Sequence, residues 1–128
     1  MKRLLILLVL LCQSFGAAAQ WTPVMLDEMV ITYIDRNTQR GKGGMVKMWW
    51  LVDYQLVQIT NEKGYFSRVQ YSEYDCRQRR SRVMSVALMS QPMGHGETVF
   101  EDRLPRKWES VQGQPFMQAL WDIACVEY

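Results

Sequence analysis

Residues 45–54, MVKMWWLVDY, form the most strand-like stretch of this 128-residue chain. Its centre, from Met48 to Val52, is an unbroken run of large apolar side chains. Successive side chains of a strand point to opposite faces, so Trp49 and Trp50 place one indole on each face. We therefore expect a strand here with cover on both faces, near the middle of a β-sheet.

Further strand patterns lie on both sides of this stretch. Strand-rich or alternating residues predict strands at 29–35, 65–74, 80–90 and 98–101. Glycine, proline and asparagine separate them and predict a loop at 37–44 and turns at 61–64 and 91–96. Short connections between successive strands favour an antiparallel meander of five or six strands.

One amphipathic helix is expected after the strands. Pro115 suits the first turn of a helix. About twelve residues follow with a helical apolar stripe, roughly 18 Å long. The stripe consists of Phe116, Leu120, Ile123 and Ala124, widened by Met117 and Trp121. The predicted fold class is α+β, an antiparallel sheet with one C-terminal helix packed on a sheet face.

Composition excludes several function classes. Hydrophobic residues make up 48% of the chain and charged residues 22%, a balance typical of one folded domain. A formal charge of +2 gives no support for nucleic-acid binding. One His and three Cys are too few for most multi-ligand zinc sites. Neither a catalytic residue, a metal site nor a cofactor is predicted, and we expect no enzyme.

Residues 1–19 have the layout of a secretory signal peptide. Lys2 and Arg3 precede an apolar run over residues 4–11, and three alanines at 17–19 give a small-residue cleavage site. We expect cleavage between Ala19 and Gln20, which leaves residues 20–128 as the mature domain. The alternative is a transmembrane anchor, but the apolar run is well short of the roughly 20 residues that span a bilayer.

Cys12 raises a second alternative, a lipoprotein in which this cysteine carries the lipid. That processing requires a small residue before the cysteine, and Leu11 is large. We therefore assign Cys12 to the removed segment and expect no transmembrane anchor after processing.

Two cysteines remain in the mature domain, Cys76 and Cys125. An even pair in an exported chain predicts one disulfide, with two buried free thiols as the alternative. A loop of about 50 residues closed in this way gains roughly 4 kcal/mol in the chain-entropy model. Without Lys2 and Arg3 the basic residues fall from 15 to 13, equal to the 13 acidic residues.

The densest charge cluster is a candidate partner site. It holds four guanidinium groups within six residues: Arg77, Arg79, Arg80 and Arg82. On a strand, Arg80 and Arg82 share one face. One interpretation is a solvated hairpin end beside Glu73 and Asp75. The other is a docking patch for an acidic protein or a polyanion, which guanidinium groups hold in a forked geometry.

The single histidine has no ligand set near it in the sequence. His95 lies between Gly94 and Gly96 and is predicted to be a turn residue. The alternative is a metal or haem contact completed by a second copy of the chain. The methionines are spread over separate predicted elements, which favours core filling over a copper site.

Several short motifs, read in order, carry a family resemblance. They are Tyr33-Ile34-Asp35, Val46-Lys47-Met48-Trp49, Tyr74-Asp75-Cys76 with the arginines that follow, Met93-Gly94-His95-Gly96-Glu97, and Trp108 and Val111 before a helix with Cys125. In this order, behind a signal peptide, they resemble the surface-adhesin protein E family of Gram-negative bacteria over roughly residues 30–126.

The resemblance implies an antiparallel sheet with a C-terminal helix and a disulfide. It also implies a function, because the family takes its name from an adhesin that binds host matrix and serum proteins. We expect an exported, non-catalytic module that binds a host or envelope protein, in the periplasm or on the outer cell surface. The alternative is a periplasmic envelope protein that carries a small ligand such as haem in an aromatic, methionine-lined groove between sheet and helix.

Overall fold

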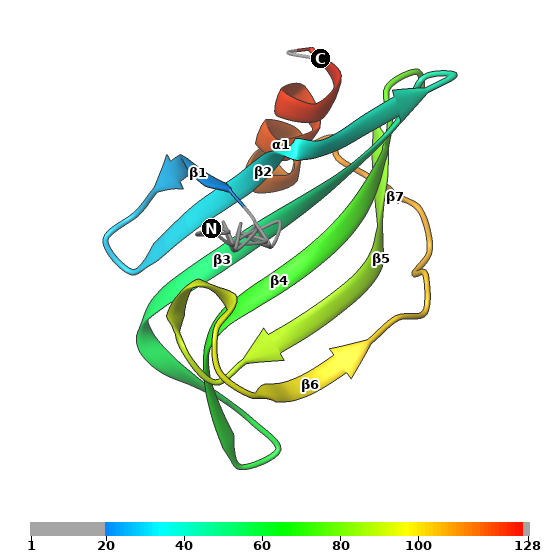
Figure 1. The fold of residues 1–128 in the computed structure, drawn as a ribbon. Helices are drawn as coiled ribbons and strands as arrows, with labels where there is room; N and C mark the ends of the chain where they lie inside the picture. Colours follow the sequence, from blue (N-terminus) through cyan, green and yellow to red (C-terminus); the bar gives the residue numbers. More distant parts are fainter. Residues whose placement is uncertain (1–19, 127–128) are drawn as a thin grey trace, which may run out of the picture.

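The computed structural model describes residues 20–126, so the predicted signal peptide lies outside the described residues (Figure 1). Within these residues, seven strands and two helical elements follow one another. They are β1 (Trp21–Leu26), β2 (Val30–Lys42), β3 (Met45–Thr60), β4 (Lys63–Asp75), β5 (Arg80–Met89), the 3-10 turn η1 (Pro92–Gly94), β6 (Thr98–Asp102), β7 (Glu109–Ser110) and α1 (Pro115–Cys125).

The strands form one antiparallel sheet in chain order. Strands β1 to β6 are neighbours in sequence and in space, and the short β7 pairs with the beginning of β5. This is the predicted meander, with α1 as the predicted C-terminal helix on one face. No helix within residues 20–126 has both the length and the apolar character needed to cross a membrane.

Helix α1 covers one face of the sheet near one end of β3 and β4 (Figure 1). Its buried residues are Leu120, Trp121 and Ala124, as the apolar stripe predicts. They join a core cluster with sheet residues that include Ile34, Met48, Trp50 and Tyr74. Phe116, also predicted in the stripe, lies at the margin of the core, partly exposed, with its ring 5.6 Å from that of Trp50.

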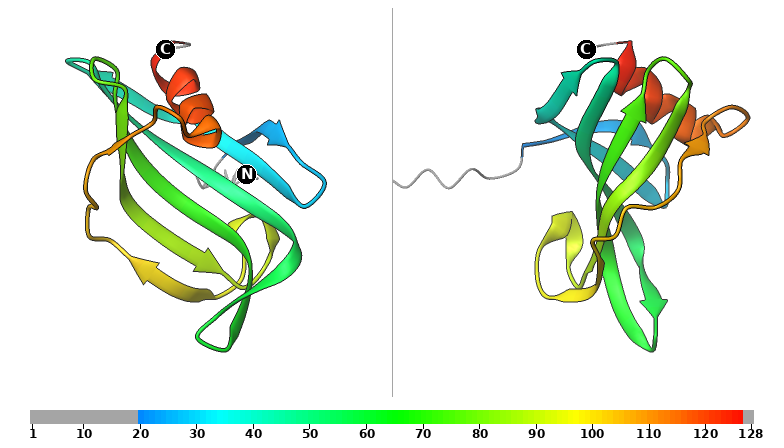
Figure 2. Two further views of the ribbon diagram at one scale, coloured as in Figure 1. Left: turned by 180° about the vertical axis from the view of Figure 1, so that it is seen from behind. Right: turned by 90° about the vertical axis from the view of Figure 1, so that its right-hand side faces the viewer.

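The opposite face is covered by the loop that contains η1, so both faces of β3 have cover as its sequence predicts. A side-chain Cβ at Gly94 would lie 3.1 Å from Val69 and 3.3 Å from Leu51, so the loop lies directly on these residues. The backbone N–H of Met93 donates to Asp53 Oδ1 at 3.1 Å and fixes the loop there. Figure 2 shows this loop and α1 on opposite sides of the sheet.

The loop predicted at 37–44 is wrong, because β2 continues to Lys42. Residues 36–39 bulge out of the ladder, and residues 40–42 then pair with residues 45–47. The hairpin closes at Gly43 and Gly44, with φ of +64° and +81°, the left-handed conformation that tight two-residue hairpin turns require. The three glycines of 37–44 predict a longer loop than the two-residue turn that forms.

Two strands are absent from the predicted set. Strand β1 contains Pro23, which interrupts a strand pattern but is tolerated on an edge strand, where no partner needs its N–H. Strand β7 has only two residues, Glu109 and Ser110, too few to show a period. Both lie beside strands that were predicted, so they extend the sheet without changing its class.

Candidate functional site

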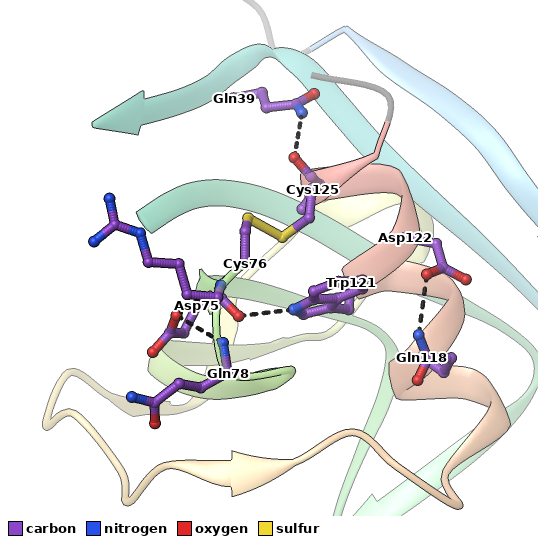
Figure 3. Close-up of a disulfide and its surroundings, with 10 residues drawn as sticks. Gln39, Asp75, Cys76, Gln78, Gln118, Trp121, Asp122 and Cys125 are labelled. Atoms are coloured by element: carbon purple, nitrogen blue, oxygen red, sulfur yellow. Dashed lines mark hydrogen bonds between the residues drawn. A yellow bond between two sulfur atoms is a disulfide. The ribbon is translucent and has the colours of Figure 1, made fainter. Parts of the chain in front are cut away.

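A disulfide joins the end of β4 to the last turn of α1 (Figure 3). Cys76 and Cys125 are 49 residues apart in sequence, with a Cα–Cα distance of 5.4 Å. This distance is within the usual range for a disulfide. The pairing is the one that an even cysteine count in an exported chain predicts.

Hydrogen bonds reinforce the same junction. The indole Nε1–H of Trp121 donates to the backbone carbonyl of Asp75 at 2.9 Å. The side-chain amide of Gln39, in the bulge of β2, donates to the carbonyl of Ala124 at 3.1 Å (Figure 3). Helix α1 is therefore tied to two strands by side chains as well as by the disulfide.

The carboxylate of Asp75 organises the β4–β5 turn. Its Oδ1 accepts hydrogen bonds from the backbone N–H groups of Arg77 and Gln78 at 3.0 and 3.2 Å, and its Oδ2 accepts one from Arg80 Nε at 2.9 Å. Burial by itself raises the pKa of this carboxyl. The hydrogen bonds and the Arg80 charge outweigh burial and hold the pKa of Asp75 below its usual value.

A second ion pair lies beside the first on the sheet. Arg82 Nη2 is 2.7 Å from Glu73 Oε1, in a directly opposed cross-strand pair, and Lys47 Nζ is 4.0 Å from Glu73 on its other side. The indole of Trp108 completes the arrangement. The guanidinium carbons of Arg80 and Arg82 each lie 4.6 Å from its ring centroid.

The four arginines of the candidate partner patch therefore have different surroundings. Arg80 and Arg82 share a face, as predicted, and are half-buried, each with a carboxylate and Trp108. Arg77 and Arg79 are exposed in the β4–β5 turn. The Arg79 guanidinium carbon is 5.6 Å from the Trp121 ring centroid, and Arg77 packs against the backbone at Gly44. We call the four residues the arginine corner; Arg77 and Arg79 are the two with charge open to solvent.

The alternative function predicted from the sequence requires a ligand groove between the sheet and the helix. Among residues 20–126, two cavities lie between these elements. A cavity of about 440 Å³ lies between the β1–β2 turn and the first turn of α1, with Met25 and Phe116 among its walls. A cavity of about 280 Å³ lies between β3–β5, α1 and the segment before β7. His95 belongs to neither, because it follows η1 on the opposite face.

Metal ligands are not brought together in the described part of the chain. Among residues 20–126 there is no group of three His, Cys, Asp or Glu side chains placed to hold a metal ion.

A surface feature absent from the predictions is the far end of the β3–β4 hairpin, residues 54–65, which we call the hairpin tip. Residues 54–57 bulge opposite a single residue of β4, and the chain turns at Asn61 and Glu62. Three large apolar side chains are exposed there, Leu56 by 60%, Val57 by 48% and Ile59 by 67%. The signal in the sequence is three apolar residues, Leu56, Val57 and Ile59, just beyond the predicted strand at 45–54.

A comparison with known protein families finds one family that matches this chain. The family described as surface-adhesin protein E matches residues 21–126. The chain belongs to this family. A comparison with curated proteins gives no significant match.

Solved structures of protein E from Haemophilus influenzae have the same fold. Crystal form II is 14% identical, with a TM-score of 0.64 over 88% of this chain and 98% of that one. The structure from non-typeable H. influenzae is 15% identical, with a TM-score of 0.63 over 88% of this chain and 80% of that one. At such low identity the likeness establishes the fold and assigns no binding residue.

Two of the motifs that carry the family resemblance lie at the contact between the sheet and α1. Tyr74, Asp75 and Cys76 lie at the junction with α1, and Val111 is fully buried beneath it. None of the motif residues lies in the hairpin tip. The motifs that carry the family resemblance are thus separate from the exposed apolar side chains of the hairpin tip.

Proposed function

We propose that this protein is an exported surface adhesin that acts by binding another protein and has no catalytic activity. Membership of the surface-adhesin protein E family over residues 21–126 supports this proposal. The predicted signal peptide supports export. We assign a host matrix or serum protein as the partner class. In a bacterium without a host, the partner would be a protein of the bacterial envelope.

The observation that carries the proposed binding surface is the exposure of Leu56, Val57 and Ile59 at the hairpin tip. The tip extends beyond α1 and η1, away from the disulfide (Figure 1). Apolar side chains gathered on a projecting element and surrounded by polar residues are typical of a protein–protein contact. Gln55, Glu62 and Lys63 are exposed polar residues of the same hairpin tip.

The arginine corner is the second proposed contact, for an acidic segment of the partner. Of the four arginines in the corner, Arg77 and Arg79 are the two with charge open to solvent. Contacts between exposed charges contribute to association rates more than to affinity. We therefore assign the corner a steering role and the hairpin tip the larger share of the binding energy.

A binding assay with matched variants tests this assignment. Immobilised mature protein is exposed in parallel to serum and matrix proteins and to an envelope extract, and each captured partner is then measured with purified variants. We expect L56S/I59S to weaken binding at least about tenfold, and R77S/R79S to slow association in a salt-dependent way. The control is L104S, because Leu104 is also exposed, by 76%, but lies outside the hairpin tip. Equal binding by L56S/I59S and wild type would contradict the assignment.

Localisation is tested separately. We expect exported protein to begin at Gln20 by intact-mass measurement, and protease added to intact cells to digest a surface-displayed adhesin. A lipid adduct on Cys12 would contradict the assigned cleavage. Haem addition tests the small-ligand alternative: a saturable change in haem absorbance with the purified protein would support a carrier.

A further inference from the structure

Positively charged side chains gather where the β2–β3 hairpin and the β4–β5 turn meet at one end of the sheet (Figure 1). The backbone N–H of Cys76 donates to the carbonyl of Gly44 at 2.9 Å, which ties the two turns together. The side chain of Arg77 lies across this junction, because a Cβ at Gly44 would be only 2.8 Å from its Nε. Four cations form what we call the basic surface: Arg40, Lys42, Lys47 and Arg77.

The register of the sheet places two like charges opposite each other in the basic surface. Arg40 of β2 pairs directly with Lys47 of β3, and like charges in such positions destabilise a sheet. Lys47 is 4.0 Å from Glu73, but that carboxylate is already 2.7 Å from Arg82. Among the described residues, the Arg40 guanidinium has one hydrogen-bond partner, the carbonyl of Gln39 at 3.0 Å. The arrangement is therefore unfavourable in the free protein, and a bound anion would offset it.

The other two cations of the basic surface are also without a carboxylate. Within residues 20–126, no ion pair includes Lys42 or Arg77, and both residues are exposed. Asp75, in the same row of the sheet as Lys42, is bound to Arg80 and to backbone N–H groups of the β4–β5 turn. The predicted mature domain has equal numbers of acidic and basic residues, so the excess of positive charge is local.

A groove of about 290 Å³ lies along the basic surface. Its lining includes Arg40, Lys42 and Lys47, together with Met45 and Glu73. The groove is on the sheet face away from α1, because Met45 and Lys47 alternate with residues of β3 that pack beneath the helix. Neighbouring strands are about 4.8 Å apart, so cations on β2 and β3 can engage successive anionic groups of one ligand. The groove therefore suits a ligand with several anionic groups in a row.

A sulfated polysaccharide has this chemistry. Each sulfate ester is ionised and has three terminal oxygens, so one group can accept hydrogen bonds from a guanidinium and an ammonium together. A linear polymer of high charge density also releases condensed counterions when clustered cations replace them. An acidic segment of a folded protein has a lower charge density and gains less in this way.

An anionic bilayer suits the basic surface less well. A protein that lies on a bilayer combines basic residues with apolar side chains that enter it. The exposed apolar side chains of the hairpin tip are at the other end of β3 and β4. We infer that the basic surface binds a sulfated polysaccharide of the glycosaminoglycan type, since clusters of Lys and Arg are typical of heparin-binding patches. This inference goes beyond the proposed protein contact and does not use the hairpin tip.

Titration of the mature protein with a labelled heparin octasaccharide, followed by fluorescence anisotropy, tests the inference. We expect saturable binding that weakens steeply as the salt concentration rises. The matched ligand control is an unsulfated heparosan octasaccharide, which has the same chain length and carries carboxylates without sulfates. It should bind at least about tenfold more weakly. No saturation with heparin, or equal affinity for the two sugars, would overturn the inference.

Matched variants test the residues. We expect R40Q/K42Q to weaken heparin binding at least about tenfold and to make it less dependent on salt. The control K63Q/R103Q removes the same charge from exposed positions in the hairpin tip and beyond β6, and should bind like wild type. The melting temperature of R40Q/K42Q should not fall, because the variant relieves the like-charge pair. Equal loss of binding in the two variants would assign the effect to net charge and overturn the inference.

Two further probes separate the other classes of partner. Polyglutamate represents an acidic protein segment, and phosphatidylglycerol vesicles represent an anionic bilayer. We expect neither to displace the labelled octasaccharide at a matched concentration of negative charge. Displacement by either probe as effective as that by unlabelled heparin would overturn the assignment to a sulfated polysaccharide.

Discussion

The same two strands, β3 and β4, have very different surroundings at their two ends. At one end, Val46, Met48 and Tyr74 lie beneath α1 beside the disulfide, and Asp75 and Glu73 are paired with arginines. At the other end, Leu56 and Ile59 are open to solvent. Both ends are strongly apolar in sequence, so apolar content alone does not determine burial. What decides it is whether a later segment of the chain returns to cover the strand.

The comparison predicts that changes at the junction with α1 reduce stability, whereas changes at the hairpin tip leave stability intact. Removal of the disulfide by C76S/C125S should have the largest effect. We expect a loss of about 2–5 kcal/mol in the free energy of unfolding, because the loop between the two residues regains its freedom in the unfolded chain. Urea denaturation of the oxidised wild type and the double variant measures it. Equal midpoints would show that the disulfide does not hold the helix.

Leu120→Ala tests the packing of α1 without changing the disulfide. Leu120 is fully buried, so truncation should cost about 2–5 kcal/mol. The matched change at the other end of the strands is Leu56→Ala, which should cost less than about 0.5 kcal/mol because Leu56 is exposed. The comparison between the two ends fails if both variants lose the same stability.

Asp75→Asn removes the carboxylate that orders the β4–β5 turn and leaves Arg80 without its ion-pair partner. We expect a loss of about 1–3 kcal/mol at pH 7. The pKa of Asp75 is lower in the folded protein than in the unfolded chain, where it is about 3.9. The stabilisation by this carboxylate is therefore present above about pH 4 and is lost as the pH falls through the folded-state pKa.

Denaturation of wild type and D75N at neutral and acidic pH checks the direction of this pH dependence. The gap in stability between the two proteins should narrow as the pH falls below about 4. A gap that stays constant with pH would assign the effect of the substitution to side-chain geometry and not to the charge.

The smallest effects divide the arginine corner in two. R77S/R79S should change stability by less than about 0.5 kcal/mol, because exposed charges contribute little. R80S/R82S should cost about 1–2 kcal/mol, because the variant removes the guanidinium partners of Asp75 and Glu73 and exposes Trp108. Thermal melts of the two double variants measure the difference. Equal losses would mean that all four arginines have the same role.

The sequence was sufficient for the fold class because the strand and helix patterns are long. The period of the apolar residues separates β3 from α1 without any knowledge of their contacts. The pairing of Cys76 with Cys125 needed only the cysteine count and the expected export. Strand β1 and the end of β2 were missed because Pro23 and the three glycines at 41–44 are compatible with both loop and strand.

The candidate sites were less accessible to prediction. Which arginine meets which carboxylate depends on strand register, and a shift of one residue would turn Arg82 away from Glu73. The exposure of the hairpin tip depends on how much of the sheet α1 and the η1 loop cover, which no local sequence pattern predicts. The smaller cavity is formed by segments about 70 residues apart in sequence, from Trp50 to Met117, and appears only once they are packed.

Because Cys125 lies in the C-terminal helix, the disulfide can form only after all the strands have been translocated. The hairpins of the meander involve neighbours in sequence, so each can form as soon as its second strand has emerged from the export machinery. The thiol of Cys76 emerges before β5, β6 and α1, and its partner arrives only after the whole sheet. The predicted cleavage after Ala19 removes Cys12, and residues 20–126 hold no third cysteine, so in a chain cleaved in this way a wrong protein–protein bridge would form between two molecules. With that cleavage, we expect mispairing of Cys76 to increase with the concentration of newly exported chains.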